Sequence, residues 1–297
     1  MTIAATAATP EAVSGYALLT VAVDGPAPNL FATSASGTTQ YLRNVWGTSA
    51  TAVFAVGMNG TIRHWDGTTW TEQASGTTAH LAGLWGTSPL NVFVTGTGGT
   101  ILRYDGTTWT AQESGTTQTL GKVWGTSPTD VFAVGDGGTI VRYDGAGWTV
   151  LASGTTTTLN DVWGTSATNV FAVGDAGTIV HWDGTAWAAQ VSGTTEHLRR
   201  VWGTSPSNVF ATGTGGTVLR YDGTTWAAMA SGTTQHLYGL RGTSPTNVFA
   251  TGWNGTILRY DGTSWTAMTS GTTDSLQGAW VSPGGDLWIV GSNGTVR

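Results

Sequence analysis

The sequence lacks cysteine entirely over its 297 residues. This absence excludes disulfide frameworks, thiolate catalysis and cysteine metal sites, and it leaves the redox compartment open. Lysine occurs only at Lys122, and the formal net charge is -6. The dense basic surface that binds phosphate backbones is therefore missing, and we expect no binding of nucleic acid.

Hydrophobic runs are short as well. No apolar stretch approaches the roughly 20 residues of a membrane-spanning helix. The stretch from Ala17 to Val23 is short and rich in β-branched residues, and no lysine or arginine precedes it, so it is a poor secretory signal. We expect a soluble protein without a cleaved signal or membrane insertion, in a compartment that the sequence does not specify.

A repeated unit dominates what is present. The tryptophan of a Trp-Gly-Thr-Ser motif lies at Trp46, Trp85, Trp124, Trp163 and Trp202, is replaced by Arg241, and returns at Trp280, with a constant step of 39 residues. A period of this size is typical of propellers, solenoids and other arrays. Seven such units cover nearly the whole chain, so one repeat domain is a better interpretation than two independent domains.

Each unit contains four short extended segments and no helical periodicity. In the second unit these are Leu81 to Trp85, Val92 to Thr95, Thr100 to Tyr104 and Trp109 to Gln112, separated by turns rich in glycine, proline and aspartate. The pattern predicts an all-β fold, a seven-bladed β-propeller with 39-residue, four-stranded antiparallel blades. A parallel β-helix is the competing architecture, although its coils are usually shorter.

The two ends of the sequence are complementary parts of one unit. Residues 1–15 have no pattern and are expected to form a flexible tail, whereas 16–297 form the propeller. The seventh unit stops before any Asp-Gly-Thr-Thr-Trp segment, and a strand at about 27–35 would complete it, which closes the ring without an open sheet edge.

Aromatic residues recur at fixed positions and are expected to fill the gaps between blades. In the second strand they are Phe54, Phe93, Phe132, Phe171, Phe210, Phe249 and Trp288. The Trp-Gly-Thr-Ser tryptophans occupy one position of the first strand and are assigned to the core as well.

The third strand of each unit ends in a more ambiguous group of residues. A cation or imidazole, an aromatic ring and an aspartate follow one another at His64-Trp65-Asp66, Arg103-Tyr104-Asp105, Arg142-Tyr143-Asp144, His181-Trp182-Asp183, Arg220-Tyr221-Asp222 and Arg259-Tyr260-Asp261. The structural interpretation is a tight Asp-Gly turn covered by the next tryptophan. The functional interpretation is a sugar subsite, because an aromatic face, a carboxylate and a donor suit the apolar face and hydroxyls of a pyranose, in several copies.

The unit L-x-x-V-W-G-T-S-P-T-D-V-F-A-V-G-x-x-G-T-I-x-R-Y-D-G-T-T-W resembles the bacterial neuraminidase repeat, or Asp-box, of propellers related to photosystem II assembly and stability factors, over about residues 36 to 297. It departs from an Asp-box because Asp105 precedes Trp109 by four residues and not five. This ending is more similar to the hairpins of propeller lectins, which implies sugar binding between blades. The arginine triad and tyrosine nucleophile of sialidases have no counterpart at non-repeated positions.

Two positions vary from unit to unit while their surroundings stay constant. One follows Ser-Gly-Thr-Thr, and the other is the turn between the second and third strands, and both are expected on one face of the ring. Turns drift freely, which is one explanation. The other is an asymmetric partner site at His197, Arg199, Arg200, His236, Tyr238, Arg241 and Trp253.

These observations together favour a non-catalytic, multivalent carbohydrate-binding propeller of lectin type. The alternative is a protein-interaction or assembly scaffold that uses the variable face. We expect glycans or a protein as partner, a monomer, no catalytic residues, no cofactor and no metal site, because His80, His197 and His236 belong to different blades.

Deletion of residues 1 to 35 is predicted to lower the melting temperature of the whole domain, because it removes the strand expected to close the ring. Thermal unfolding of the full chain and the truncated chain tests this, and an unchanged melting temperature would contradict it.

Overall fold

The computed structural model describes residues 36–49, 51–281 and 287–291. These residues form six four-stranded antiparallel sheets, each made of four strands that follow one another in the chain, and one two-stranded sheet. We call the six sheets blades 1 to 6 in chain order. Because all strand pairs are antiparallel, the parallel β-helix is excluded.

The first and second strands of each blade are the longer ones. The first strands are β1 (Leu42–Ser49), β5 (Leu81–Ser88), β9 (Leu120–Ser127), β13 (Leu159–Ser166), β17 (Leu198–Ser205) and β21 (Leu237–Ser244). The second strands are β2 (Ala52–Gly57), β6 (Asn91–Gly96), β10 (Asp130–Gly135), β14 (Asn169–Gly174), β18 (Asn208–Gly213) and β22 (Asn247–Gly252).

The third and fourth strands are shorter. The third strands are β3 (Ile62–Trp65), β7 (Ile101–Tyr104), β11 (Ile140–Tyr143), β15 (Ile179–Trp182), β19 (Val218–Tyr221) and β23 (Ile257–Tyr260). The fourth strands are β4 (Trp70–Gln73), β8 (Trp109–Gln112), β12 (Trp148–Leu151), β16 (Trp187–Gln190), β20 (Trp226–Ala228) and β24 (Trp265–Met268).

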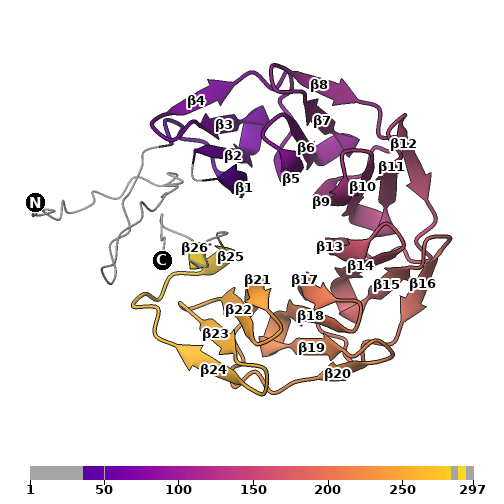
Figure 1. Cartoon of the computed structure of the whole chain (residues 1–297), viewed down its shortest axis with the longest axis vertical. Coiled ribbons are helices and arrows are strands. Elements are labelled where there is room, and N and C mark those ends of the chain that lie inside the picture. Colours follow the sequence, from indigo (N-terminus) through magenta and orange to yellow (C-terminus); the bar gives the residue numbers. More distant parts are fainter. Residues whose placement is uncertain (1–35, 50, 282–286, 292–297) are drawn as a thin grey trace, which may run out of the picture.

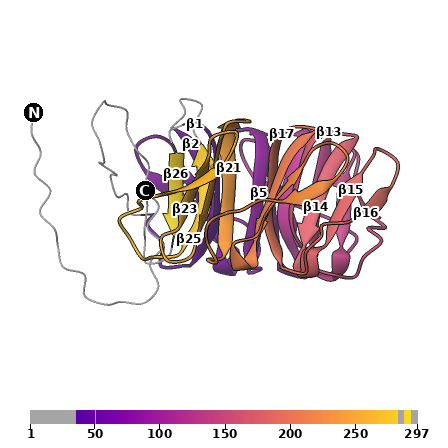
Figure 2. The ribbon, with the colours of Figure 1, turned by 90° about the horizontal axis from the view of Figure 1, so that it is seen from below.

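The blades are arranged around one axis, with the first strands nearest the centre and the fourth strands at the outer rim (Figure 1). Seen from the side, the strands cross the thickness of a flat ring (Figure 2). The first strands of consecutive blades contact one another around the centre, as β9 contacts β13 and β13 contacts β17.

Six blades are complete in the described residues, and not the seven that the repeat count predicts. Of the seventh unit, the described residues contain β25 (Leu276–Val281) and β26 (Leu287–Gly291) alone. The tail at 1–15 and the closing strand at about 27–35 lie outside the described residues.

The core lies between blades, as the aromatic pattern predicts for the second strands. Phe54 is fully buried and makes edge-on contacts with two rings of the next blade, Tyr104 at 5.4 Å and Trp109 at 5.8 Å between centroids. Phe171 meets Tyr221 and Trp226 in the same way. Each of these phenylalanines therefore depends on the next blade for its aromatic contacts.

The first-strand tryptophan reaches the next blade at a glycine. An added Cβ on Gly125 would lie 2.8 Å from the ring of Trp85 and 2.6 Å from the carbonyl oxygen of Asp130. Gly164, Gly203 and Gly242 stand in the same relation to the tryptophan of the preceding blade. The glycine of the Trp-Gly-Thr-Ser motif is thus required by close approach between blades.

Substitution Gly125→Ala is predicted to destabilise the protein by about 1 to 3 kcal/mol, because the methyl group overpacks the contact with Trp85. Gly147→Ala is the control: its added Cβ meets nothing within 4 Å, and other blades carry Thr108 or Ala186 at that position. Denaturant unfolding measures both, and equal stability of the two variants would contradict the prediction.

Candidate functional site

The aspartate that ends each third strand is held in a local turn. In blade 2, Oδ1 of Asp105 accepts hydrogen bonds from the backbone N–H groups of Thr107 and Thr108, both at 2.8 Å, and from the Thr107 hydroxyl at 2.7 Å. Asp66, Asp183, Asp222 and Asp261 bind their turns in the same pattern, and Asp144 uses two backbone N–H groups.

These hydrogen bonds stabilise the charged carboxylate and lower its pKa. Donation from the backbone of Thr108, then from the side chain and backbone of Thr107, lowers the pKa of Asp105 to about 2. The pKa values of Asp183, Asp222 and Asp261 are lowered to about 2 for the same reason, and those of Asp66 and Asp144 are lowered too.

The aromatic rings of this group are directed into the interface between blades. Five of the six rings are buried, namely Tyr104, Tyr143, Trp182, Tyr221 and Tyr260, and Trp65 of blade 1 is half-buried. The ring of Tyr104 stacks on Trp109 with 4.9 Å between centroids, and its hydroxyl donates to the carbonyl of Gly106. A ring packed in this way has no free face for a sugar.

The cations and histidines at these sites also have protein partners. Arg103 donates to the side-chain oxygen of Asn91 and, through Nη1, to the hydroxyl of Tyr143 in the next blade at 3.0 Å. Arg142 forms an ion pair with Asp130 at 2.7 Å. Arg220 and Arg259 donate to Asn208 and Asn247, whereas His64 and His181 lie on Phe54 and Phe171.

Burial lowers the pKa of both His64 and His181, against a smaller opposing effect of the following aspartate. All three members of the repeated group are therefore engaged in turns and packing. The structural interpretation accounts for their contacts, and the prediction of a repeated sugar subsite gains no support from them.

The turn aspartates predict a loss of stability in acid. Their folded pKa values near 2 lie below the value of about 3.9 in an unfolded chain. The charged form therefore stabilises the fold fully above about pH 4, and this contribution disappears as the pH falls through about 2.

A variant with Asp105→Asn, Asp183→Asn and Asp222→Asn keeps an acceptor that does not titrate. Denaturant unfolding at pH 5 and pH 2.5 should show a smaller acid loss in this variant than in the wild type, and equal losses would refute the assignment.

The two variable positions of each repeat lie side by side, as the sequence predicts. In every blade, the first residue of the turn after the second strand donates its N–H to the carbonyl of the residue before the first strand, as Thr97 does to His80 and Trp253 to His236. Five of these turns form short 3-10 helices: η1 (Met58–Gly60), η2 (Thr97–Gly99), η3 (Asp136–Gly138), η4 (Asp175–Gly177) and η5 (Thr214–Gly216).

Three aromatic residues gather at this face on blade 6. Trp253 is 43% exposed, and its ring lies 4.3 Å from that of His236 and 6.0 Å from that of Tyr238 between centroids. His236 also accepts a hydrogen bond at Nδ1 from the N–H of Gly215 in blade 5. We call His236, Tyr238 and Trp253 the aromatic cluster.

A charged group lies at the junction of blades 4 and 5. Oδ1 of Asp175 is 3.0 Å from Nδ1 of His197 and 3.2 Å from Nη1 of Arg199, and it accepts a hydrogen bond from the Asn160 amide at 2.8 Å. The predicted partner residues on this face are thus divided between a charged group and the aromatic cluster.

Arg200 and Arg241 lie elsewhere, on the first strands β17 and β21, which surround the centre of the ring (Figure 1). Both interact electrostatically with Asp161 of β13, and Arg200 and Arg241 also lower the pKa of Lys122 on β9. The sequence placed Arg200 and Arg241 in one group with the aromatic cluster, and it left Lys122 out. The missed signal was that Lys122, Asp161 and Arg200 share one position of the repeat.

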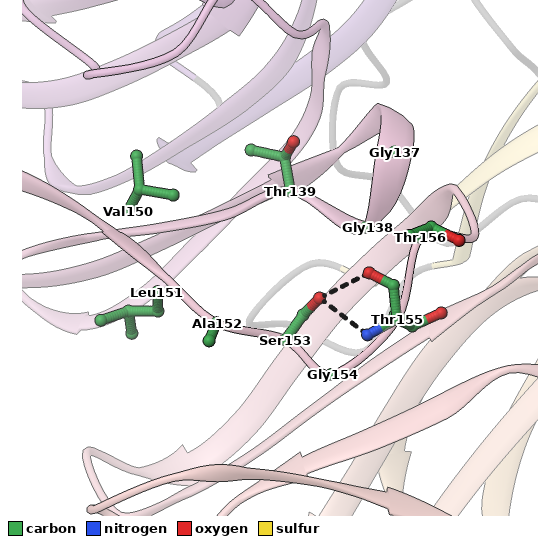
Figure 3. Close-up of a pocket in the computed structure, with 10 residues that line it drawn as sticks. All are labelled: Gly137, Gly138, Thr139, Val150, Leu151, Ala152, Ser153, Gly154, Thr155 and Thr156. Carbon is green, nitrogen blue, oxygen red and sulfur yellow. Dashed lines mark hydrogen bonds between the residues drawn. The ribbon is translucent and has the colours of Figure 1, made fainter.

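A shallow hollow of about 670 Å³ lies beside blade 3 (Figure 3). It is lined by the η3 turn, by Val150 and Leu151 of β12 and by the following Ser-Gly-Thr-Thr turn, in which Ser153 and Thr155 exchange hydrogen bonds. The same turn recurs at Ser75, Ser114, Ser192, Ser231 and Ser270. The hollow is therefore framed by the common blade structure.

Within the described ranges, no three histidine, aspartate or glutamate side chains come together as a metal site would require. The same part of the chain contains no helix that is long and apolar enough to span a bilayer.

Comparison with solved structures gives close geometric matches at low sequence identity. YCF48 bound to D1 peptide matches with a TM-score of 0.72 and 15% identity, over 88% of this chain and 91% of that chain. YCF48 from Cyanidioschyzon merolae has a TM-score of 0.71 and 16% identity, over 94% and 98%. The WD40 β-propeller domain of Doa1 has a TM-score of 0.74 and 15% identity, over 95% and 96%.

This chain has a β-propeller fold. No protein-family model and no curated protein matches its sequence. The identities establish the fold alone, and the resemblances to Asp-box repeats and to propeller lectins stay predictions.

Proposed function

We propose that this propeller is a protein-interaction or assembly module that binds its partner with one asymmetric site on the variable face. The observation that carries the proposal is the aromatic cluster of His236, Tyr238 and Trp253, which occurs in blade 6 alone among the six complete blades. Since the other blades have Met58, Thr97, Asp136, Asp175 and Thr214 in place of Trp253, this surface is not a consequence of the repeat.

The cluster has the chemistry of an interaction hot spot. A tryptophan that is nearly half exposed, with a histidine and a tyrosine against its ring, offers a rigid apolar surface with polar edges. The junction of blades 4 and 5 adds a polar rim, in which Arg199 donates to the carboxylate of Asp175 and Nδ1 of His197 accepts a hydrogen bond from the N–H of Ala176. A hydrophobic centre beside a polar rim is typical of protein interfaces.

The compared structures support a protein partner. One of them is described as YCF48 bound to D1 peptide, and another is a WD40 domain. The interpretation as a lectin has weaker support, because the aromatic rings of five of the six predicted subsites are buried between blades. We accordingly propose a module that binds and does not catalyse.

Substitution Trp253→Thr is predicted to weaken partner binding at least about tenfold, since it removes the large ring and installs the residue that blades 2 and 5 carry. The experiment is proximity cross-linking from a photoreactive residue at exposed position 254, which leaves Trp253 in place, in the source cell extract, followed by affinity measurement with the purified partner. One partner per chain is expected.

The matched control is Thr97→Ala, at the same position of blade 2, which should leave affinity unchanged. Equal affinities of the wild type and the Trp253→Thr variant, or several equivalent sites per chain, would refute the proposal. A glycan array with the same two variants separates the alternative, because a lectin with repeated sites would bind sugar regardless of Trp253.

A further inference from the structure

Every arginine on a third strand is paired with the side chain of a hydrogen-bond acceptor. Their acceptors are Glu72 for Arg63, Asn91 for Arg103, Asp130 for Arg142, Asn208 for Arg220 and Asn247 for Arg259. Three cations on the first strands differ, whereas Arg199 of β17 is paired with Asp175. Within the described ranges, Lys122 and Arg241 make no hydrogen bond or ion pair, and the guanidinium of Arg200 donates only to the carbonyl of Arg199 at 2.8 Å.

These three cations act on one another although they belong to different blades. Lys122 in blade 3 interacts electrostatically with Arg200, two blades further on, and with Arg241, three blades further on. First strands surround the centre of the ring (Figure 1), so these three residues belong to strands that border the same central space. Among the residues that the structure describes, Asp161 is the one carboxylate that interacts with all three, and its Oδ2 already accepts a hydrogen bond from the N–H of Val201 at 3.0 Å.

The positive charges are therefore incompletely compensated. Burial, with smaller contributions from Arg200 and Arg241, lowers the pKa of Lys122 to about 7, and burial also lowers the pKa of the half-buried Arg200. A partly desolvated cation without a partner costs free energy that an anion would recover.

These three side chains are accessible to a dissolved ligand. Lys122 and Arg200 are half-buried and Arg241 is exposed, so solvent reaches all three. Blade 6 has Gly239 at the repeat position of Lys122, which leaves that side of the group without a competing side chain.

We propose that Lys122, Arg200 and Arg241 form a binding site for a small oxyanion at the centre of the ring. The ligand group is a phosphate, sulfate or carboxylate, since a guanidinium fork matches two oxygens of such a group and an ammonium adds a point charge. The site is distinct from the aromatic cluster, so it does not rest on the proposed partner binding.

A small anion fits this site better than an extended polyanion. The chain as a whole carries a net charge of -6, so its outer surface repels a long acidic chain. The cations are concentrated on the strands around the centre, where only a compact anion contacts them without lying along the acidic surface.

Calorimetric titration of the full chain with sulfate, inorganic phosphate and succinate, at pH 6.5 and low ionic strength, tests the proposal. At least one of these anions should bind with a stoichiometry of one, and the three titrations distinguish a phosphate or sulfate group from a carboxylate. Lys122→Gln and Arg200→Gln should each weaken binding about tenfold. The control is Arg43→Gln, which removes the same charge from an exposed position on β1 and should leave affinity unchanged.

Two further measurements keep the proposal testable if a cation variant unfolds. Asp161→Asn keeps an acceptor for Val201 but removes the opposing charge, so it should strengthen anion binding. Sulfate binding to the wild type should weaken between pH 6 and pH 8.5 as Lys122 loses its proton beside Arg200, Arg241 and Asp161, because sulfate does not titrate in this range.

Any of three results would overturn the proposal. The first is that none of the three anions binds at 10 mM, a concentration about tenfold above a dissociation constant of about 1 mM. The second is that Arg43→Gln weakens binding as much as Lys122→Gln does, and the third is that an acidic peptide binds while the small anions do not.

Discussion

Contact between the phenylalanine of one blade and the aromatic pair of the next is the interaction on which the ring depends. Phe54 meets Tyr104 and Trp109, and the same arrangement recurs at Phe93, Phe132, Phe171 and Phe210. A four-stranded blade alone would leave these rings in water. The stability of each repeat is therefore largely an interface energy, as is general for repeat proteins.

This constraint explains why most of the repeated chemistry is structural. Asp105 holds the turn that positions Trp109, Tyr104 fills the interface, and Arg103 connects Asn91 with Tyr143 of the following blade. A side chain that must satisfy the interface in every blade is not free to contact a ligand. Function is accordingly expected where the repeats differ, since those positions are released from this requirement.

The strands and their interfaces could be predicted from the sequence, because period, turn residues and aromatic spacing all report local geometry. The grouping of Trp253 with His236 could be anticipated as well, since both positions vary from unit to unit. The burial of Tyr104 could not, because a ring beside a carboxylate looks the same in a binding site and in a packed interface. The separation of Arg200 from the aromatic cluster depends on where the first strand lies relative to the ring axis, which the repeat period does not report.

The turns on the variable face join neighbouring repeats. The turn after the second strand of each blade lies between its own blade and the connection that enters the following one, so the N–H of Gly215 in blade 5 meets His236 of blade 6, and Asp175 of blade 4 meets Arg199 of blade 5. Each such site on the surface is thus formed by residues of two consecutive repeats. The order of the units determines the surface, whereas the contacts of the phenylalanine with the next blade recur from junction to junction. Exchange of two whole repeats would keep the architecture but change which residues lie side by side on the variable face. A small set of repeat units can therefore produce many different surfaces when the units are placed in different orders.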